Sequence, residues 1–301
     1  MMKKIIITGA SGFIGKSFFN HFKQNNAVQV ETLSLRNNWV LNKNADVIIH
    51  LAAKSSDSYK TSDEKEYFEV NRDLTIKLFQ AFLDSKIKDF IYFSSAKVIT
   101  DNAADCLTEE TPLNPMSVYG RSKKAAEEYL LAHKLPEGKR LLIIRPCLVH
   151  GEGNHGNLIT LYKLVKKGLP WFFAGFENKR SFLHIDNLIY CIDKLLEDRN
   201  IASGVYNIAD DQPISTNELI SLMGEVAKKR VRLWTIPSGL VSATFKVGDI
   251  LHLPINTNIL NKLTGNFFIS NQKLKDAINV EKLPFSTQEG LLKTLNSIKD
   301  K

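Results

Sequence analysis

A glycine-rich turn close to the N-terminus constrains the fold of this chain more than any other feature. Residues 9–15 read Gly-Ala-Ser-Gly-Phe-Ile-Gly, directly after the apolar run Lys4–Thr8. Glycines at this spacing, between a strand and a helix, permit a tight turn and a close approach of the backbone to a pyrophosphate that faces the helix N-terminus. The turn therefore predicts a dinucleotide site with contacts from Gly9, Ser11, Gly12, Phe13, Ile14 and Gly15.

Short apolar runs alternate with helix-period segments through the first half of the chain. Runs typical of buried parallel strands span Lys4–Thr8, Asp46–Leu51, Phe90–Ser94 and Leu141–Arg145. Between them, apolar side chains such as Ile14, Phe18 and Phe22 share one helical face and can cover a sheet. We expect an α/β fold, a Rossmann doubly wound parallel sheet with a smaller C-terminal α/β substrate-binding domain.

The pattern changes after Arg145-Pro146, where a glycine-rich turn and proline-broken helical segments begin. We assign residues 1–150 to the dinucleotide-binding domain, together with about 183–212, because Gly204–Ala209 is typical of one more sheet strand. The substrate domain then comprises about residues 151–182 and 213–301. Within it, Ser215-Thr216-Asn217-Glu218 before an apolar run has the form of a capping box that opens a helix.

Composition excludes several classes of protein. The chain has 301 residues, 44% of them apolar and 24% charged, which is typical of a globular protein rather than a disordered or collagen-like one. Three cysteines without C-x-x-C spacing predict neither a disulfide framework nor a zinc site, and they fit a reducing cytoplasm. The longest uncharged stretch, Leu233–Phe245, is shorter than the ~20 residues that span a bilayer. The net charge of +8 suits nucleic acid, anionic lipid or a phosphorylated substrate, or is simply a solvated lysine-rich surface.

A second constellation is Tyr119-Gly120-Arg121-Ser122-Lys123, preceded by Ser94-Ser95 at the end of a predicted strand. Tyr119 and Lys123 are four residues apart and share a helix face. A phenol is a poor base at its usual pKa of about 10, but a nearby ammonium and a positively charged nicotinamide favour the phenolate. Lys123 supplies that charge, and Ser95 can hydrogen-bond the reacting oxygen. Tyr-x-x-x-Lys alone is common on amphipathic helices; together with the glycine turn it predicts a catalytic set of Ser95, Tyr119 and Lys123.

On these residues the sequence resembles the extended short-chain dehydrogenase/reductases, and within them the nucleotide-sugar 4-epimerases and 4-ketoreductases. The resemblance covers nearly the whole chain and includes Asp46–Ala53, Tyr67–Asn71, Phe93–Ala96, Arg145-Pro146, Arg180–Asp186 and Leu283–Ser286. It implies NAD or NADP as cofactor. It also implies further cofactor contacts from Leu51, Ala52, Ala53, Asn71, Ser94 and Pro146, with Tyr119 and Lys123 beside the nicotinamide ribose.

The same resemblance implies where a nucleotide-sugar substrate binds. Arg180 would grip the nucleotide diphosphate, as an arginine fork suits phosphate oxygens. Trp171 and Phe172 lie in a segment that resembles the one holding the uracil base, although aromatics at these positions would also suit a core. The remaining substrate contacts implied are Ser95, Asn157 and Lys262.

Several departures from the family pattern bear on the cofactor and the reaction. Ser34, with Arg36 close by, stands where NAD-preferring members carry an acidic residue, which favours NADP(H) because arginine suits a 2′-phosphate. Ala96-Lys97 replaces the Asp-Glu pair of the sugar 4,6-dehydratases, which argues against elimination. Leu148 replaces a substrate-contacting asparagine of many epimerases, so the substrate contacts are less defined than the cofactor contacts.

The sequence thus predicts an NAD(P)-dependent enzyme that transfers hydride at C4 of a UDP-hexose, as a 4-epimerase or a 4-ketoreductase. An epimerase holds its cofactor tightly, whereas a ketoreductase consumes NAD(P)H at each turnover. We expect a UDP-sugar as partner, a cytoplasmic location, no nucleic acid, no membrane span and no metal, and an assembly compatible with a homodimer. From a different class, a non-enzymatic dinucleotide sensor or an RNA-binding relative fits the basic charge but has no need of Ser95, Tyr119 and Lys123.

Overall fold

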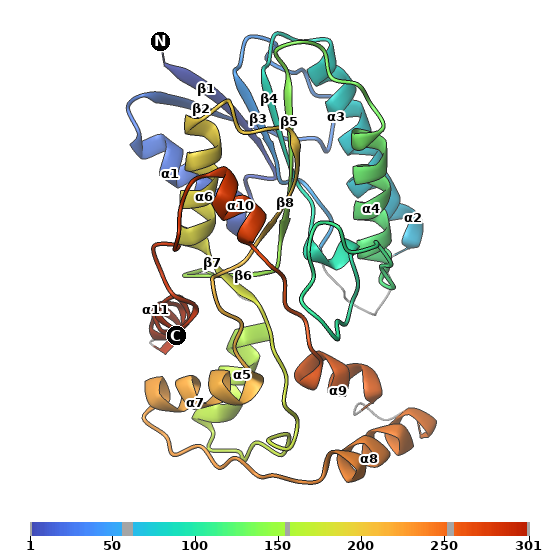
Figure 1. Ribbon diagram of the computed structural model, residues 1–301, viewed down its shortest axis with the longest axis vertical. Coiled ribbons are helices and arrows are strands. Elements are labelled where there is room, and N and C mark those ends of the chain that lie inside the picture. The colour runs from blue at the N-terminus through green and yellow to red at the C-terminus, as the bar shows by residue number, and fades with distance from the viewer. Residues whose placement is uncertain (1, 56–62, 154–156, 252–255, 300–301) are drawn as a thin grey trace.

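A six-stranded parallel sheet forms the centre of the upper part of the molecule in the computed structural model, which describes residues 2–55, 63–153, 157–251 and 256–299 (Figure 1). The strand order is β2-β1-β3-β4-β5-β8, and every neighbouring pair is parallel. The strands are β1 (Lys3–Thr8), β2 (Val28–Leu33), β3 (Val47–His50), β4 (Asp89–Phe93), β5 (Arg140–Pro146) and β8 (Gly204–Ile208). The predicted doubly wound sheet is confirmed. Because β2 and β3 lie on opposite sides of β1, the switch point at which such sheets bind ligands lies beside β1.

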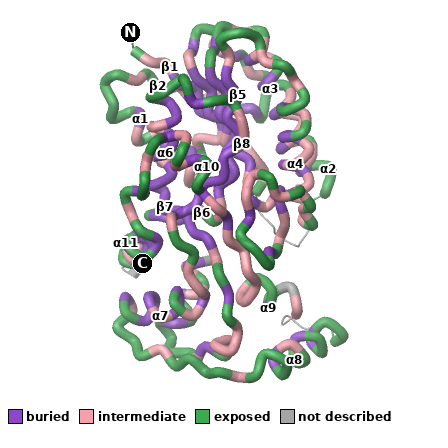
Figure 2. The backbone as a smooth tube through the Cα atoms, in the orientation of Figure 1, coloured by how far each residue is buried: buried purple, intermediate pink, exposed green. Residues whose placement is uncertain are grey.

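Helices cover both faces of this sheet (Figure 1). On one face α1 (Phe13–Gln24) and α6 (Ile185–Glu197) share an apolar cluster with Ile5 and Ile7. On the other face α3 (Leu74–Leu83) and α4 (Val118–Leu131) pack with Ile48 of β3 and with Ile6, which alternates with Ile5 and Ile7 along β1. Figure 2 shows the resulting buried band along the sheet. Short turns complete this region, namely α2 (Glu64–Phe68), the π-helical Glu69–Asp73 and the 3-10 turn Ala96–Val98.

A lower region of helices has its own apolar core. The helices α5 (Asn157–Lys166), α7 (Thr216–Ala227) and α11 (Thr287–Lys299) contribute to one cluster that also contains Trp171 and Phe182. The predicted capping box opens α7, because the Ser215 hydroxyl accepts from the Glu218 amide and the Glu218 carboxylate accepts from the Ser215 amide. The chain also forms α8 (Ser238–Ile250), α9 (Thr257–Thr264) and the two parallel strands β6 (Leu148–His150) and β7 (Phe182–His184).

One late helix lies with the sheet rather than with the lower helices. Leu274 of α10 (Gln272–Ala277) joins the apolar cluster of α1 and α6, as do Ile278 and Leu283. Residues around α10 therefore pack on the upper region, although the sequence places them in the substrate domain. The division into two domains stays a proposal, which the separate upper and lower cores support. Within the described residues, no helix combines the length and apolar character needed to cross a bilayer.

Candidate functional site

A cleft of about 2290 Å³ runs along the carboxyl ends of the sheet strands. It is larger than the roughly 300–1,000 Å³ of a pocket for one small ligand, so it has room for two. The upper lining comprises residues 9–15 after β1, 34–36 after β2, 51–53 after β3, 94–95 after β4 and Pro146 at the end of β5, together with Tyr119 and Lys123. The lower lining includes Arg180, Asn261, Lys262 and Phe267. The strand ends thus gather most of the predicted site residues along one surface.

The glycine turn is built for close approach to an anion. Gly9 has φ +71°, and a Cβ there would lie 2.6 Å from the Ala52 amide nitrogen, so no other residue fits the turn against the end of β3. Gly12 precedes α1 and offers no side-chain cap, and the first turn of α1 has no acidic residue. The first N–H groups and the positive end of the helix dipole therefore face the cleft with no acidic side chain in the same helical turn. These features fit the pyrophosphate of a dinucleotide.

The end of β2 carries the two residues on which the choice between NAD and NADP depends. Leu35 is 6% exposed and packs in the core, whereas Ser34 and Arg36 on either side are exposed and line the cleft. Of the described residues that line the cleft at this point, none is acidic. The Arg36 amide donates to the Ser34 hydroxyl, which keeps the two residues in one turn.

The Lys123 side chain is buried beneath the cleft. It is 1% exposed, and its Nζ donates to the Phe93 carbonyl oxygen at 2.7 Å. Burial lowers the pKa of Lys123 from 10.5 to about 7, and the negative charge of Glu127 opposes this shift. Glu127 lies one turn further along α4, is 0% exposed and accepts from Arg145 Nε at 3.0 Å. A buried chain of Lys123, Glu127 and Arg145 therefore sets the charge beside Tyr119.

The start of α4 is held against the segment that follows Ser95. The Ser117 hydroxyl caps the helix by accepting from the Gly120 amide. A Cβ at Gly120 would lie 2.6 Å from the Lys97 carbonyl oxygen, so only glycine permits this contact. Ser95 itself caps the next turn by accepting from the Lys97 amide at 3.2 Å. The sequence motifs assigned no role to Ser117 or Gly120, although a serine before the helix is a recognisable capping signal.

Asn71 is predicted to contact the cofactor, but it is buried away from the cleft lining. Its Nδ2 donates to Ser122 Oγ at 2.9 Å and to the Lys54 carbonyl oxygen at 3.1 Å, and its Oδ1 accepts from the Lys54 amide at 2.8 Å. The side chain thus joins the segment after β3 to α4. It therefore holds Lys54 and Ser122, which are the chain neighbours of Ala53 and Lys123.

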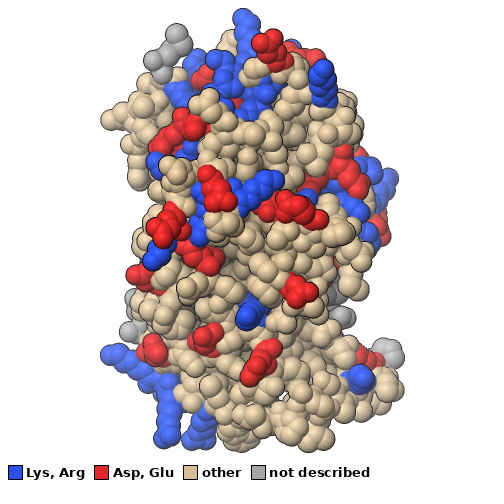
Figure 3. Space-filling model, viewed as in Figure 1, with Lys and Arg blue, Asp and Glu red and all other residues tan. Residues whose placement is uncertain are grey.

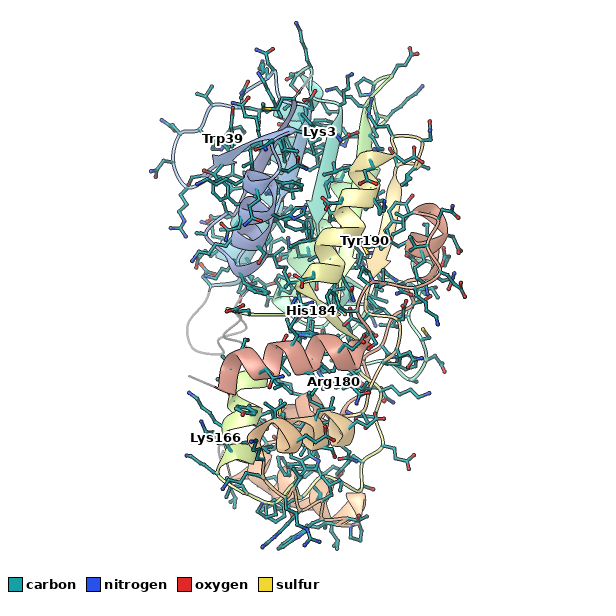
Figure 4. All side chains as sticks on the ribbon, turned by 90° about the vertical axis from the view of Figure 1, so that its left-hand side faces the viewer. Lys3, Trp39, Lys166, Arg180, His184 and Tyr190 are labelled. Carbon is teal, nitrogen blue, oxygen red and sulfur yellow. The ribbon has the colours of Figure 1, made fainter. Side chains whose placement is uncertain are left out.

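The lower side of the cleft carries two cations. Arg180 is half-buried, which lowers the pKa of its guanidinium, and its Nη1 donates to the Lys262 carbonyl oxygen. Figure 4 shows Arg180 at the level between the upper region and the lower helices. Asn157 begins α5, but its side chain lies outside the described part of the structure.

The predicted uracil segment does not reach the cleft, since neither Trp171 nor Phe172 is among its lining residues. The Trp171 indole is buried in the lower core and donates to Asn217 Oδ1 at 2.9 Å. Phe172 is 41% exposed, and its ring packs against Trp234 on the outer surface. The alternative interpretation, in which aromatics of this segment form core, describes Trp171. Because Trp171 pairs with Leu233 in a strand-like bridge, neighbouring side chains point to opposite faces.

The family model described as the NAD dependent epimerase/dehydratase family matches residues 5–209. The chain belongs to this family. The matched span contains the glycine turn, Ser95, Tyr119 and Lys123, and it extends through β8. The predicted family is therefore confirmed, and the family description agrees with NAD or NADP as the class of cofactor.

Two relatives cover nearly the whole chain. The UDP-glucose 4-epimerase of Vibrio cholerae is 29% identical over 333 residues, which cover 98% of this chain and 95% of the relative. The N-acetyl-alpha-D-glucosaminyl-diphospho-ditrans,octacis-undecaprenol 4-epimerase of Escherichia coli O157:H7 is 27% identical, with the same coverage of 98% and 95%. Among solved structures, RMD from Pseudomonas aeruginosa complexed with NADPH is similar, with a TM-score of 0.74 and 21% identity over 99% of this chain and 100% of that chain. This likeness supports the fold.

Proposed function

We propose that this family member catalyses 4-epimerisation of a UDP-hexose, with Tyr119 as the acid/base residue. The observation that carries the proposal is the arrangement of the cleft. Ser95, Tyr119 and Lys123 lie in it between an uncapped helix N-terminus above and the Arg180–Lys262 pair below. Two anion-binding places on either side of one acid/base set suit a dinucleotide and a sugar diphosphate.

When bound, the nicotinamide dinucleotide would supply the acceptor and then the donor of the C4 hydride. The residues of this chain transfer the proton of the C4 hydroxyl. Tyr119 removes the proton from the C4 hydroxyl as hydride leaves, and returns a proton to the same oxygen when hydride comes back. The Lys123 ammonium stabilises the Tyr119 phenolate, and Glu127 favours that ammonium against the effect of burial. The Ser95 hydroxyl hydrogen-bonds the oxygen at C4 and orients it.

The lower cations supply binding rather than chemistry. Arg180 and Lys262 suit the oxygens of a diphosphate, since charge-assisted hydrogen bonds are stronger than neutral ones. The names of both 4-epimerase relatives describe a hexose attached to a diphosphate carrier. We therefore expect the diphosphate to be the part of the substrate that Arg180 and Lys262 bind.

A 4-ketoreductase is the second candidate, and the turn after β2 favours it. Ser34 and Arg36 line the cleft, with no acidic residue among the described lining there to accept from an adenosine 2′-hydroxyl. This pair suits NADP(H), which reductases consume. Ser34→Asp should then move the preference toward NAD(H). Arg36→Ala should weaken NADP(H) by about 1.5–3 kcal/mol and leave NAD(H) nearly unchanged.

The deciding experiment identifies the cofactor that the purified protein retains and then tests turnover. Mass spectrometry of released cofactor is followed by incubation with UDP-glucose and with UDP-N-acetylglucosamine. Retained NAD and a C4 epimer formed without added cofactor support the epimerase. If added NADPH is consumed only when a 4-keto sugar is supplied, the result supports the ketoreductase. If parent and Tyr119→Phe protein are equally inactive in both assays, the proposal of an enzyme fails and a dinucleotide sensor takes its place.

A further inference from the structure

The lower end of the molecule carries a concentration of exposed cations. Seven exposed basic side chains lie on two segments, at the end of α5 and after α7: Lys163, Lys166, Lys167, Lys228, Lys229, Arg230 and Arg232. Within the described part of the chain, none of them forms a salt bridge. We call this set the basic cluster. Glu225 lies beside Lys228, Lys229 and Arg230 and offsets one of the seven positive charges, so the cluster remains strongly positive.

Backbone pairing brings the two basic segments together. The Trp171 amide donates to the Arg232 carbonyl oxygen at 2.9 Å, and the Trp234 amide donates to the Trp171 carbonyl oxygen at 2.9 Å. Lys166 and Lys167 precede this short ladder by a few residues, as Arg230 does on the other segment. Figure 3 shows Lys and Arg side chains gathered at the lower left, and Figure 4 shows Lys166 at the outer edge of the same end.

Large apolar side chains are exposed beside the basic cluster. Phe172 is 41% exposed and Trp234 is 48% exposed, and their rings meet edge to face with centroids 5.2 Å apart. Leu169 is 52% exposed and Leu233 is 42% exposed in the same two segments. An exposed apolar patch beside a charged rim is typical of an interaction surface rather than of scattered surface residues.

The exposed apolar surface extends along α8. Leu240, Val247 and Leu251 fall on one face at positions i, i+7 and i+11, and they are 64%, 51% and 61% exposed. A different face of α8 already packs on the protein through Val241 and Phe245. The outer stripe is therefore additional to what the fold needs. In Figure 1, α8 and the segment leading to it form the lower edge of the molecule.

We propose that this lower end docks on an anionic lipid bilayer. Amphipathic surfaces with Lys and Arg beside Trp, Phe and Leu bind at the boundary between headgroups and acyl chains. The basic cluster would lie among anionic headgroups, while Phe172, Trp234 and the α8 stripe reach the apolar boundary. Helix α8 packs on α9, which contributes Lys262 to the cleft, so docking brings the substrate side of the cleft near the membrane.

The observed surface fits a bilayer better than two other occupants. RNA would match the basic cluster, but it would leave the exposed apolar side chains of the α8 stripe in water. A second copy in a twofold interface would place one basic cluster against another, which repels. Anionic lipid satisfies both the charge and the apolar area.

Vesicle cosedimentation of the 301-residue protein tests the proposal. We expect binding to vesicles of phosphatidylcholine mixed with phosphatidylglycerol, weak binding to phosphatidylcholine alone, and loss of part of the binding at high salt. The triple variant Lys228→Gln/Lys229→Gln/Arg230→Gln should bind anionic vesicles at least about tenfold more weakly. The matched control Lys43→Gln/Lys86→Gln/Lys88→Gln, with exposed lysines at the opposite end of the sheet, should bind as the parent does.

Tryptophan quenching by brominated acyl chains tests the apolar contact separately. Quenching should persist in Trp171→Phe, whose indole is buried, and should be lost in Trp234→Phe. A cooperative melting transition in each variant shows that it is folded. The proposal fails if anionic vesicles are not bound, or if the two triple variants bind alike. It also fails if only an RNA oligonucleotide responds to the basic cluster, or if Trp234→Phe instead abolishes a dimer.

Discussion

The region built on the sheet buries charged side chains, whereas the lower helices expose large apolar ones. Lys123, Glu127 and Arg145 are 1%, 0% and 3% exposed, while Trp234 and Leu240 are 48% and 64% exposed. Both arrangements work against stability, since buried charge loses hydration and exposed apolar surface contacts water. The upper region therefore loses stability through buried charge, and the lower region loses it through exposed apolar surface. In the upper region, the buried charges lie beside the acid/base site that we propose; in the lower region, the exposed apolar side chains form the surface that we propose binds lipid.

We expect the largest effect from a substitution of Tyr119, the proposed acid/base residue of the upper region. Tyr119→Phe should lower turnover by roughly 10²–10⁴, the usual contribution of a positioned acid/base group. Retained cofactor and melting temperature should match the parent, because the ring remains. Steady-state kinetics with whichever UDP-sugar the parent converts gives the answer, and a variant that keeps most of its turnover would remove Tyr119 from the chemistry.

Glu127→Gln tests whether the buried charges of the upper region depend on one another. Removing one partner of a buried pair leaves Arg145 uncompensated and should lower the free energy of unfolding by about 3–5 kcal/mol. The matched control is Glu128→Gln, whose exposed carboxylate lies 3.6 Å from Lys124 and should change stability by less than about 1 kcal/mol. Urea denaturation measures both. Equal effects would mean that burial of this pair carries no special cost.

Arg180→Ala tests a lower-region cation whose side chain is half-buried rather than exposed. It should weaken UDP binding by about 1.5–3 kcal/mol, as expected for a hydrogen bond to a charged group, and leave cofactor binding unchanged. Lys179→Ala, at the exposed neighbouring position, should leave UDP affinity intact. Isothermal titration calorimetry with UDP would contradict the assignment if both variants bind as the parent does.

The pKa of Lys123 predicts how stability changes with pH. Because its pKa is about 7 in the folded protein and 10.5 for an unperturbed lysine, the unfolded chain binds more protons between these values. The free energy of unfolding should therefore rise with pH through this window, by up to about 1.4 kcal/mol per pH unit. Lys123→Met should be more stable than the parent below about pH 7 and lack this dependence. The prediction would be contradicted if the free energies of unfolding of the parent and of Lys123→Met changed with pH in the same way.

We expect the smallest effect on the free energy of unfolding from substitutions of two tryptophans in the lower region. Trp171→Phe removes a buried hydrogen bond to Asn217 and should lower the free energy of unfolding by about 1 kcal/mol. Trp234→Phe keeps the edge-to-face contact with Phe172 and should change stability by less than about 0.5 kcal/mol. Thermal denaturation of the two variants measures the difference. If Trp234→Phe costs as much as Trp171→Phe, Trp234 has a structural role in addition to its exposed one.

Sequence patterns anticipated the parts of the molecule that local order determines. The strands, the glycine turn and the Ser215 capping box follow from periodicity and spacing within a few residues, and all are present. The Lys123–Glu127–Arg145 chain was not anticipated, because Glu127 and Arg145 meet through tertiary packing of a helix on a strand. The resemblance implies that Asn71 contacts the cofactor; the sequence does not reveal that its amide also joins the Lys54 backbone to the Ser122 hydroxyl.

The aromatic segment shows the same limit in the lower region. A run of Trp171, Phe172 and Phe173 does not reveal which side chain turns inward. That choice depends on pairing with Leu233, about sixty residues away in the chain. Contacts made across such separations leave no periodic signal in either segment.

The return of the chain to the sheet as β8 has a consequence for biosynthesis. The edge of β5 pairs with residues 204–208, so every nascent chain that ends between β5 and β8 exposes the unpaired backbone of a buried strand. An open strand edge is a template for pairing with another chain. During translation this edge stays open while the ribosome adds more than fifty further residues. Slow codons just after β5 would lengthen that interval and favour aggregation, whereas rapid synthesis through β8 would protect the folding intermediate.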